Sequence, residues 1–364
     1  MEVPLNPITS HQSKILFLTP WYPSEKDAMS GLFVQKHAEA VRAQGCEVRV
    51  IFSPGWIDTW RQWRTLRREG WMPDVVQLNV IQKQGLGALW LKRRYGIPYV
   101  IVEHWSGYLP ENGMYHRFGA FKKRFMHTVC RQAEIVLTVS RTLQQAMIKC
   151  GFEARRWGTI DNVVDDFFFQ GVESQKGTEP VESRKTLLHV SCFDERAKNV
   201  KGLLRAAKML SEKRRDWQLV FVGTGIDYQE VRTYAESLDI PEDLLRWTGE
   251  LTPQEVADEM HKADALVLSS RYETYGVVLA EAVAAGMKIV STPVGIAEET
   301  GALIVPQEIA QYKPGKFAEF IETILWSTEY RVQNTDLLSA KRFSAEETGK
   351  KLKEFYDSCL HRNI

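Results

Sequence analysis

Short apolar runs rich in β-branched residues recur through the first half of the chain. They are Ile15–Leu18, Val48–Phe52, Val75–Leu78, Tyr99–Val102 and Ile135–Val139. Because most of these runs are continuous rather than alternating, they predict parallel strands that are buried on both faces. Between them lie amphipathic stretches such as 33–43, where Val34, Ala38 and Val41 mark one face of a helix. Strands that alternate with helices predict βαβ units and an open parallel sheet.

A second series of the same kind follows residues 171–185, whose polar sequence with two glycines and a proline predicts a linker. Its expected strands are Thr186–Val190, Gln218–Val222, Ala265–Leu268, Ile289–Ser291 and Leu303–Val305. The sequences 252–255 and 344–347 have the pattern of capping boxes, and the second is expected to open a last helix that runs to about Leu360. The chain is therefore predicted to be α/β, with one Rossmann-like domain in 1–170 and another in 186–340.

The composition narrows the class of protein. The 364 residues are enough for two domains, and 44% apolar with 26% charged residues excludes a disordered or fibrous chain. No apolar run approaches the roughly 18 residues that cross a bilayer, and residues 1–14 lack the apolar stretch of a signal peptide. The five cysteines include no C-x-x-C pair, which suits a reducing cytoplasm and argues against disulfides or a structural zinc site.

The net charge of +1 conceals two halves of opposite sign. Residues 1–170 hold 22 Lys+Arg against 15 Asp+Glu, a net charge of +7, and the remainder has a net charge of −6. A nucleic-acid-binding domain usually shows a stronger basic bias. The split instead indicates that the first domain meets an anionic partner, such as a membrane surface or a phosphorylated substrate.

The segment 271–281 carries the sharpest chemical pattern. Glu273 and Glu281 flank Gly276 where the expected strand Ala265–Leu268 gives way to a helix. In a doubly wound sheet, ligands bind outside the carboxyl ends of the strands, and a helix N-terminus there favours anions. Carboxylates only accept hydrogen bonds, so this pair suits the hydroxyls of a sugar or a ribose.

This segment resembles the E-x₇-E signature of the retaining glycosyltransferases of family 4. These enzymes have the GT-B fold, in which two Rossmann-like domains face each other across a cleft. Six further regions are similar to the family in the right order: Thr19–Pro23 with Ser30–Phe33, Val102–Gly107, Val139–Ser140, Ile160–Asp165, Val222–Gly225 and Thr292–Glu299.

The resemblance implies a role for each site residue. Glu281 would hold the nucleotide ribose, and Glu273 would hold the hydroxyls of the donor sugar. His104 would line the donor-sugar site from the opposite domain, as a catalytic residue alongside Glu273. The remaining donor-binding positions are loop glycines and backbone groups: Gly31, Gly223, Gly225, Leu251, Thr274, Tyr275, Gly276 and Val277.

The expected diphosphate site departs from the family's pattern, in which an arginine and a lysine both bind the donor diphosphate. Lys198 matches the lysine, but Phe193 stands where the arginine is expected, and Arg196 is the candidate to replace it. A dinucleotide fingerprint at 223–228 is disfavoured because Tyr228 occupies its last glycine position. Without a D-x-D sequence or a His/Cys cluster, we expect no metal, and no cofactor besides the nucleotide sugar.

One amphipathic stretch leaves two interpretations open. Trp56, Trp60 and Trp63 follow helical spacing among four arginines, and Phe118–Phe125 adds further aromatic and basic residues. Such a stretch is typical of a helix in a membrane interface. It is also typical of a core-facing aromatic stripe with solvated arginines.

Together these features predict a retaining, metal-independent hexosyltransferase whose donor is UDP- or GDP-linked. Its acceptor would be a glycan or a polyprenyl-linked glycan bound by the first domain, in cell-surface polysaccharide synthesis. The last helix, 341–364, would return to that domain. We expect a cytoplasmic protein, peripheral at the inner face of the membrane, with no nucleic-acid partner. An epimerase of nucleotide sugars with the same fold and a non-catalytic nucleotide-sugar-binding protein remain as alternatives, although the Glu273/Glu281 pair argues against the second.

Overall fold

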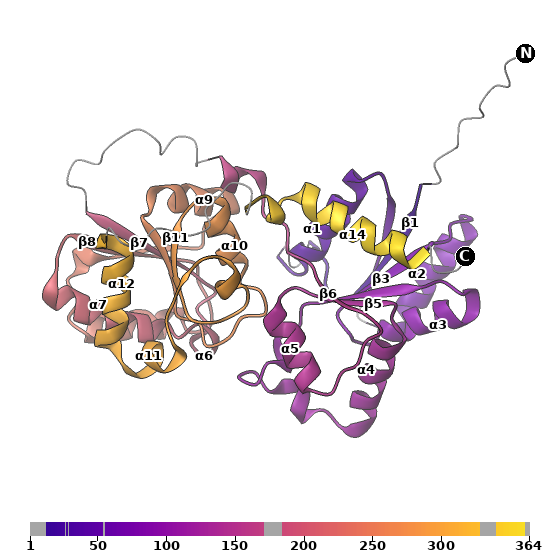
Figure 1. The fold of residues 1–364 in the computed structure, drawn as a ribbon, viewed down its shortest axis with the longest axis horizontal. Coiled ribbons are helices and arrows are strands. Elements are labelled where there is room, and N and C mark those ends of the chain that lie inside the picture. The colour runs from indigo at the N-terminus through magenta and orange to yellow at the C-terminus, as the bar shows by residue number, and fades with distance from the viewer. Residues whose placement is uncertain are drawn as a thin grey trace, which may run out of the picture.

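The computed structural model describes residues 12–25, 27, 29–53, 55–170, 184–327 and 340–360. Two parallel sheets of six strands form the centres of two α/β lobes (Figure 1). The predicted α/β class and GT-B architecture are confirmed. The predicted linker lies largely outside the described residues, so the domain boundaries stay predictions.

The first sheet has the strand order β2-β1-β3-β4-β5-β6. Its strands are β1 (Lys14–Thr19), β2 (Glu47–Phe52), β3 (Val75–Asn79), β4 (Tyr99–Glu103), β5 (Ile135–Thr138) and β6 (Trp157–Thr159). All neighbours pair in parallel, with Ile15 opposite Val48 and Val75. The central strands β3, β4 and β5 are buried along their whole length, as their continuous apolar sequences predict.

The second sheet has the order β12-β11-β10-β7-β8-β9. Its strands are β7 (Lys185–Val190), β8 (Trp217–Val222), β9 (Leu245–Gly249), β10 (Ala265–Leu268), β11 (Lys288–Ser291) and β12 (Leu303–Ile304). All ten strands expected from the sequence are present. The edge strands β6 and β9 were not predicted, because each is short and only half-buried, with a glycine and polar residues in place of an apolar run.

Helices cover both faces of each sheet, and their bounds are α1 (Leu32–Ala43), α2 (Trp56–Arg68), α3 (Gly85–Tyr95), α4 (Ala120–Gln132), α5 (Arg141–Lys149), α6 (Glu195–Lys198), α7 (Val200–Lys213), α8 (Tyr228–Ser237), α9 (Pro253–Lys262), α10 (Val277–Ala284), α11 (Gln307–Tyr312), α12 (Pro314–Trp326) and α14 (Ala345–Leu360). The capping box at α9 is confirmed: Thr252 Oγ1 accepts from Glu255 N, and Glu255 Oε2 accepts from Thr252 N. At α14 one half of the expected capping box is present: Ser344 Oγ accepts from Glu347 N at 3.2 Å, whereas Ser344 N donates to the carbonyl of Lys341 at 3.0 Å.

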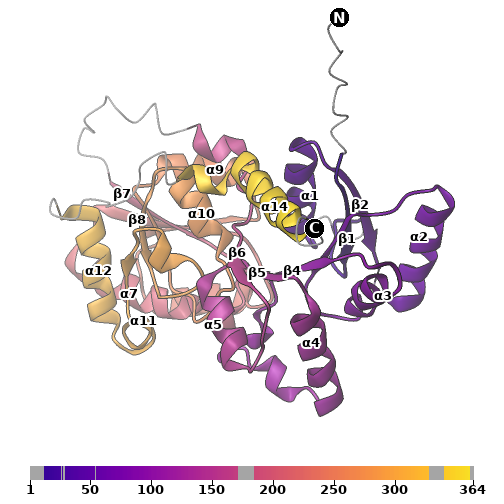
Figure 2. The ribbon, with the colours of Figure 1, turned by 45° about the vertical axis from the view of Figure 1, so that its right-hand side comes forward.

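The helix α14 crosses back to the first sheet, where it lies beside α1 (Figures 1 and 2). The two helices touch closely, since a Cβ on Gly349 would lie 2.4 Å from the carbonyl oxygen of Ala40. Tyr356 reaches the sheet itself and donates its hydroxyl hydrogen to Gln77 Oε1 in β3. Leu352 and Tyr356 join a buried cluster with Phe17 and Val34, so α14 is part of the core of the first lobe.

The carboxyl ends of the two sheets meet where the lobes touch. Ser140 follows β5 and donates its hydroxyl hydrogen to the carbonyl of Thr274, which follows β10, at 2.5 Å. Thr142 likewise donates to the carbonyl of Gly295, which follows β11, at 2.9 Å. Ligand sites of doubly wound sheets lie at these ends of the strands, so this junction is the place to look for the functional site.

Candidate functional site

An ion pair joins two of the predicted catalytic residues at the carboxyl ends of β7 and β10. Lys198 Nζ lies 2.5 Å from Glu273 Oε1, which also accepts the hydroxyl hydrogen of Ser270 at 2.7 Å. The two charged side chains are only 16% and 14% exposed. Burial alone would lower the pKa of Lys198, but Glu273 and other nearby acidic groups outweigh it and raise that pKa above its ordinary value. Lys198 is therefore a positive charge held beside the carboxylate of Glu273.

The loop after Glu273 presents free backbone donors. Gly276 adopts a left-handed conformation (φ 78°) and begins α10. Within the part of the chain that the structure describes, the N–H groups of Thr274, Tyr275 and Gly276 donate no hydrogen bond. The side chain of Tyr275 is buried and donates to Asp161 Oδ1 at 3.3 Å, whereas Val277 is exposed. This loop can thus offer its backbone to an anion at the amino end of a helix.

Glu281 lies in α10, two turns beyond Glu273. Its carboxylate makes no hydrogen bond to the described part of the chain. Burial raises the pKa of Glu281 to about 7, with Lys36 acting to lower it and Asp165 to raise it further. Those two neighbours form an ion pair of 2.8 Å between α1 and the segment that follows β6. Glu281 is therefore an acceptor close to the junction of the two lobes, without a hydrogen-bond partner among the described residues.

The replacement of the usual diphosphate arginine has a structural explanation. The ring of Phe193 is fully buried and contacts Phe221 and Tyr228, so this position belongs to the core of the second lobe. Arg196 is exposed on α6 and donates to the hydroxyl of Tyr272 at 3.3 Å. Arg196 is thus free to reach an anion near Lys198, and its role stays a prediction.

Three of the predicted donor-binding glycines, Gly31, Gly223 and Gly225, stand where no side chain fits. A Cβ on Gly223 (φ 112°) would lie 2.1 Å from the carbonyl oxygen of Ser191. A Cβ on Gly31 (φ 70°) would lie 2.3 Å from the carbonyl carbon of Trp21, and one on Gly225 would lie 1.7 Å from Cys192 O. Gly223 follows β8 and donates its N–H to Gly249 O at 2.7 Å. Leu251 is half-buried just before the cap of α9. All four residues lie in loops that follow carboxyl ends of strands.

His104 follows β4 and is almost fully buried. Its ring lies over Phe33, with 4.1 Å between the ring centroids, and Nε2 has no hydrogen-bond partner among the described residues. Burial, and to a smaller extent nearby His37, holds the pKa of His104 well below its ordinary value, so the imidazole is neutral at neutral pH. Among the described residues, no hydrogen bond or ion pair joins His104 to the Lys198–Glu273 pair, although both lie near carboxyl ends of strands.

Sequence reasoning missed the carboxylate beside this histidine. Glu103 is fully buried and forms no ion pair with any described residue. It accepts from the N–H groups of Ile81, His104 and Trp105 at 3.0 Å and from the hydroxyl of Tyr108 at 3.1 Å. Burial raises the pKa of Glu103, and these four donors act in the opposite direction. Glu103 therefore fixes the backbone that carries His104. An acidic residue ending an entirely apolar strand was the available signal.

Sequence reasoning also missed Asp161, a carboxylate that links the two lobes beside the loop 274–276. Asp161 receives hydrogen bonds from Tyr275 and from Arg342, the latter at 2.8 Å, and it pairs with Lys351 of α14 at 3.6 Å. Arg342 also contacts Glu299 at 3.1 Å. Three segments that are distant in sequence thus converge on one carboxylate.

The tryptophan–arginine stretch has one core-facing tryptophan and an exposed basic face, so each of the two interpretations fits part of it. It forms α2, but Trp63 is buried against Trp90 and Tyr95, whereas Trp60 is 40% exposed. The four arginines of α2 are exposed: Arg61, Arg64, Arg67 and Arg68. On α4, Phe121 is 92% exposed beside Lys122 and Lys123. Among the described residues, no helix is both long and apolar enough to span a bilayer.

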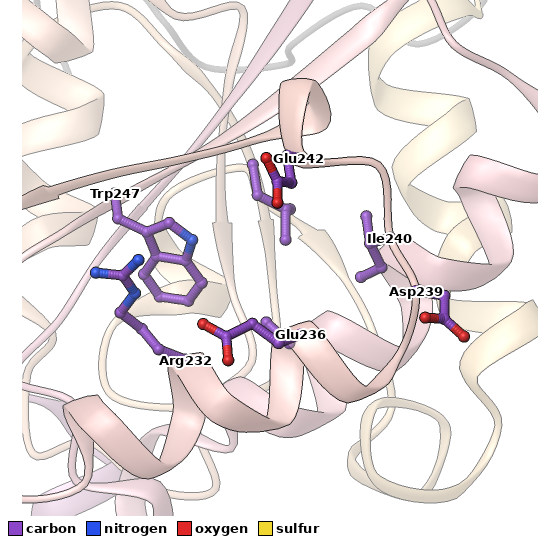
Figure 3. A pocket seen from close by; sticks show the side chains of 8 residues that line it. Arg232, Glu236, Asp239, Ile240, Glu242 and Trp247 are labelled. Carbon is purple, nitrogen blue, oxygen red and sulfur yellow. The ribbon is translucent and has the colours of Figure 1, made fainter.

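A groove of about 560 Å³ lies elsewhere in the second lobe. It runs between α8 and β9, lined by Trp247, Arg232 and several acidic side chains (Figure 3). None of the predicted site residues lines it. In the described part of the chain, no group of three or more His, Cys, Asp or Glu side chains is placed to hold a metal ion.

Two family models match successive parts of the sequence. Residues 52–166 match the model for Glycosyltransferase Family 4, and residues 172–333 match that for Glycosyl transferases group 1. These matches agree with the two parallel sheets and with the motif order. The chain belongs to the GT-B glycosyltransferases of group 1 and family 4.

Individual members of this family are only distantly similar. N-acetyl-alpha-D-glucosaminyl L-malate synthase of Bacillus anthracis is 29% identical over 45% of this chain, and lipopolysaccharide 1,6-galactosyltransferase of Escherichia coli is 27% identical over 55%. In these comparisons the chain spans 42% and 53% of the relative's own length. The solved structure of Anabaena HepE in complex with UDP-glucose has a TM-score of 0.67 at 18% identity, covering 95% of this chain and 99% of that one. This last likeness supports the fold.

Proposed function

We propose that the protein is a retaining glycosyltransferase that moves a hexose from a UDP- or GDP-linked donor to a glycan or a lipid-linked glycan. The observation that carries the proposal is the Lys198–Glu273 ion pair beside the free N–H groups of 274–276. A positive charge, a helix amino end and an acceptor-only carboxylate are the groups that a sugar diphosphate needs at one point.

Each group meets a different part of the donor. Lys198, Arg196 and the N–H groups at the start of α10 face the diphosphate, while Glu273 accepts from hydroxyls of the sugar. Glu281 accepts from the ribose. When the donor binds, Lys198 exchanges part of its contact with Glu273 for a phosphate oxygen, which leaves Glu273 free to hold the sugar.

The reaction breaks the bond between the anomeric carbon and the phosphate oxygen and forms a bond to the acceptor oxygen on the same face. Because the acceptor attacks from the face that the diphosphate leaves, no protein nucleophile is needed. The acceptor hydroxyl gives its proton to the departing diphosphate, which takes the place of a protein base. Lys198, Arg196 and the amino end of α10 balance the growing negative charge, and we propose that they do so without a metal ion or cofactor. His104, neutral and held by Glu103, lines the sugar from the first lobe.

The acceptor side of the proposal rests on charge and on a relative. Residues 1–170 have a net charge of +7, and the first lobe presents the exposed arginines of α2 and the exposed Phe121. A lipid-linked acceptor would bring this lobe to an anionic membrane surface, and we propose a cytoplasmic protein bound peripherally there. The galactosyltransferase among the relatives acts in lipopolysaccharide synthesis, by its name. That supports a role in making cell-surface polysaccharide.

A two-step experiment tests the proposal. Thermal shift with UDP, GDP and their hexose conjugates should show stabilisation by one nucleotide series. NMR of the product made with that donor and a membrane lipid extract should then show the donor's anomeric configuration retained. A free epimer formed without acceptor would make the protein an epimerase. Binding without turnover on any acceptor would make it a binding protein, and either result would overturn the proposal.

A further inference from the structure

The four-residue helix α6 carries both predicted diphosphate cations, Arg196 and Lys198. So short a helix leaves almost all of its carbonyl groups without donors of its own. Asp194 satisfies its amino end, accepting from the N–H groups of Arg196 and Ala197 at 3.0 and 3.3 Å. The position of Lys198 therefore depends on what holds the carboxyl end.

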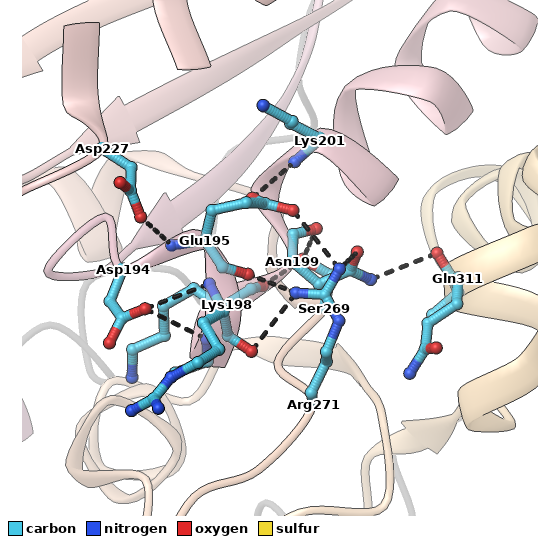
Figure 4. A network of polar contacts seen from close by, with 12 residues as sticks. Asp194, Glu195, Lys198, Asn199, Lys201, Asp227, Ser269, Arg271 and Gln311 are labelled. Atoms are coloured by element: carbon cyan, nitrogen blue, oxygen red, sulfur yellow. Dashed lines mark hydrogen bonds and ion pairs between the residues drawn. The ribbon is translucent and has the colours of Figure 1, made fainter. Parts of the chain in front are cut away.

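The segment 269–271 supplies those donors (Figure 4). Arg271 contributes its guanidinium and its backbone N–H, and Ser269 contributes its hydroxyl. Together they donate to every backbone carbonyl from 195 to 199. Arg271 Nη1 donates to Glu195 O and Arg196 O, and Arg271 N donates to Ala197 O at 2.7 Å. The hydroxyl of Ser269 lies 3.0 Å from Lys198 O and 3.1 Å from Asn199 O and is shared between them.

The second guanidinium nitrogen completes the clamp. Arg271 Nη2 donates to Asn199 Oδ1 at 2.9 Å and lies 3.4 Å from Glu195 Oε1. A planar fork can satisfy acceptors on two sides at once, which a lysine ammonium on a flexible stem cannot do in the same geometry. A cation at the carboxyl end of a helix is also favoured by the peptide dipoles.

Arg271 lies two residues before Glu273 in the same segment. The segment that carries Glu273 is thus hydrogen-bonded to the segment that carries Lys198. The ion pair between the two side chains forms between these two linked segments. Within the described part of the chain, the side chain of Arg271 donates hydrogen bonds to Glu195, Arg196 and Asn199, so Arg271 acts on the site through α6.

We propose that Arg271, assisted by Ser269, is a positioning residue that sets Lys198 for the donor diphosphate. This inference rests on the proposed function, because it takes Lys198 as the diphosphate ligand.

The test is calorimetry with UDP and GDP, and with uridine and guanosine as ligands without phosphate. Arg271→Lys should weaken binding of the preferred diphosphate about tenfold and leave the matching nucleoside unchanged. In a Lys198→Ala background, Arg271→Lys should have almost no further effect, because both changes remove the same contact. Arg214→Lys is the matched control, since Arg214 pairs with Asp216 at 2.6 Å on the surface of the same lobe.

Several results would overturn the inference. One is an equal loss of affinity for the nucleoside and for its diphosphate in Arg271→Lys. Another is a loss of affinity in the double variant that equals the sum of the losses in Arg271→Lys and Lys198→Ala. If Arg271→Lys does not fold, Ser269→Ala removes two of the bonds and should show the same selectivity with a smaller loss. If Lys198→Ala itself binds diphosphate like the wild type, the diphosphate assignment of the proposed function fails. If Lys198→Ala weakens binding and Arg271→Lys does not, only the present inference fails.

Discussion

The buried carboxyl of Glu281 makes the stability of the free protein depend on pH. Its pKa is about 7 in the folded chain against 4.5 for an ordinary glutamate. A carboxyl whose pKa is raised by folding stabilises the fold relatively at low pH, and this advantage is lost as the pH rises through the folded pKa. At about 1.4 kcal/mol per pKa unit, the ionised side chain costs about 3 kcal/mol of stability, most of which appears between pH 5 and pH 8.

Glu281→Gln removes this ionisation while keeping the shape. We expect the variant to be more stable than the wild type at pH 8, by about 2 to 3 kcal/mol, and close to it at pH 5. The same variant should bind the preferred nucleoside diphosphate about tenfold more weakly, because a charged acceptor makes the stronger hydrogen bond to ribose. Glu281 would thus weaken the fold in order to bind ligand.

Denaturant unfolding of both proteins at pH 5 and pH 8 measures the first effect, and calorimetry measures the second. Glu236→Gln, at an exposed position on α8, is the control and should show no such pH-dependent gain. A stability difference between Glu281→Gln and the wild type that is the same at both pH values would refute the reasoning, since the carboxyl would then not ionise in a buried setting.

Three further predictions concern the donor and the membrane. Lys198→Ala should lower kcat/KM at least about a hundredfold with an unchanged circular dichroism spectrum, and wild-type turnover would contradict the diphosphate assignment. Glu273→Ala should weaken binding of the nucleotide sugar but hardly that of the free nucleoside diphosphate, whereas Glu281→Ala should weaken binding of both. Calorimetry that finds equal losses of affinity for the free nucleoside diphosphate in the two variants would contradict this division of roles. Replacing the four arginines of α2 with serine should abolish salt-sensitive co-sedimentation with anionic vesicles but spare activity on a soluble acceptor, and wild-type protein that stays in the supernatant at low salt would contradict it.

The central strands were predictable because burial on both faces leaves a continuous apolar run in the sequence. The pair formed by Lys198 and Glu273 was predictable only as two separate residues. They stand 75 positions apart, and the parallel order of β7 and β10 brings them together. The motif located each residue, and the sheet topology supplied the contact.

The supporting residues were beyond sequence reasoning for a different reason. Glu103 and Arg271 bond mainly to backbone N–H and carbonyl groups, which every residue carries, so no pattern of side chains marks their partners. The stretch around Trp60 and Trp63 shows a related limit. The spacing identified one helix, but not which ring would pack under Trp90 and which would face solvent.

The return of α14 to the first sheet has a consequence for how the chain is made. The hydrogen bond between Gln77 and Tyr356 joins residues 279 positions apart. Because a ribosome builds the chain from its amino end, α14 is synthesised only after the entire second lobe. The face of the first sheet that α14 covers stays without this helix until then. In the meantime, the apolar cluster around Phe17 lacks Leu352 and Tyr356, and Gln77 lacks its tyrosine partner. We expect the nascent lobe to be more prone to aggregation in this interval, because transiently exposed apolar surface favours it. The first lobe to be translated is thus the last to be completed.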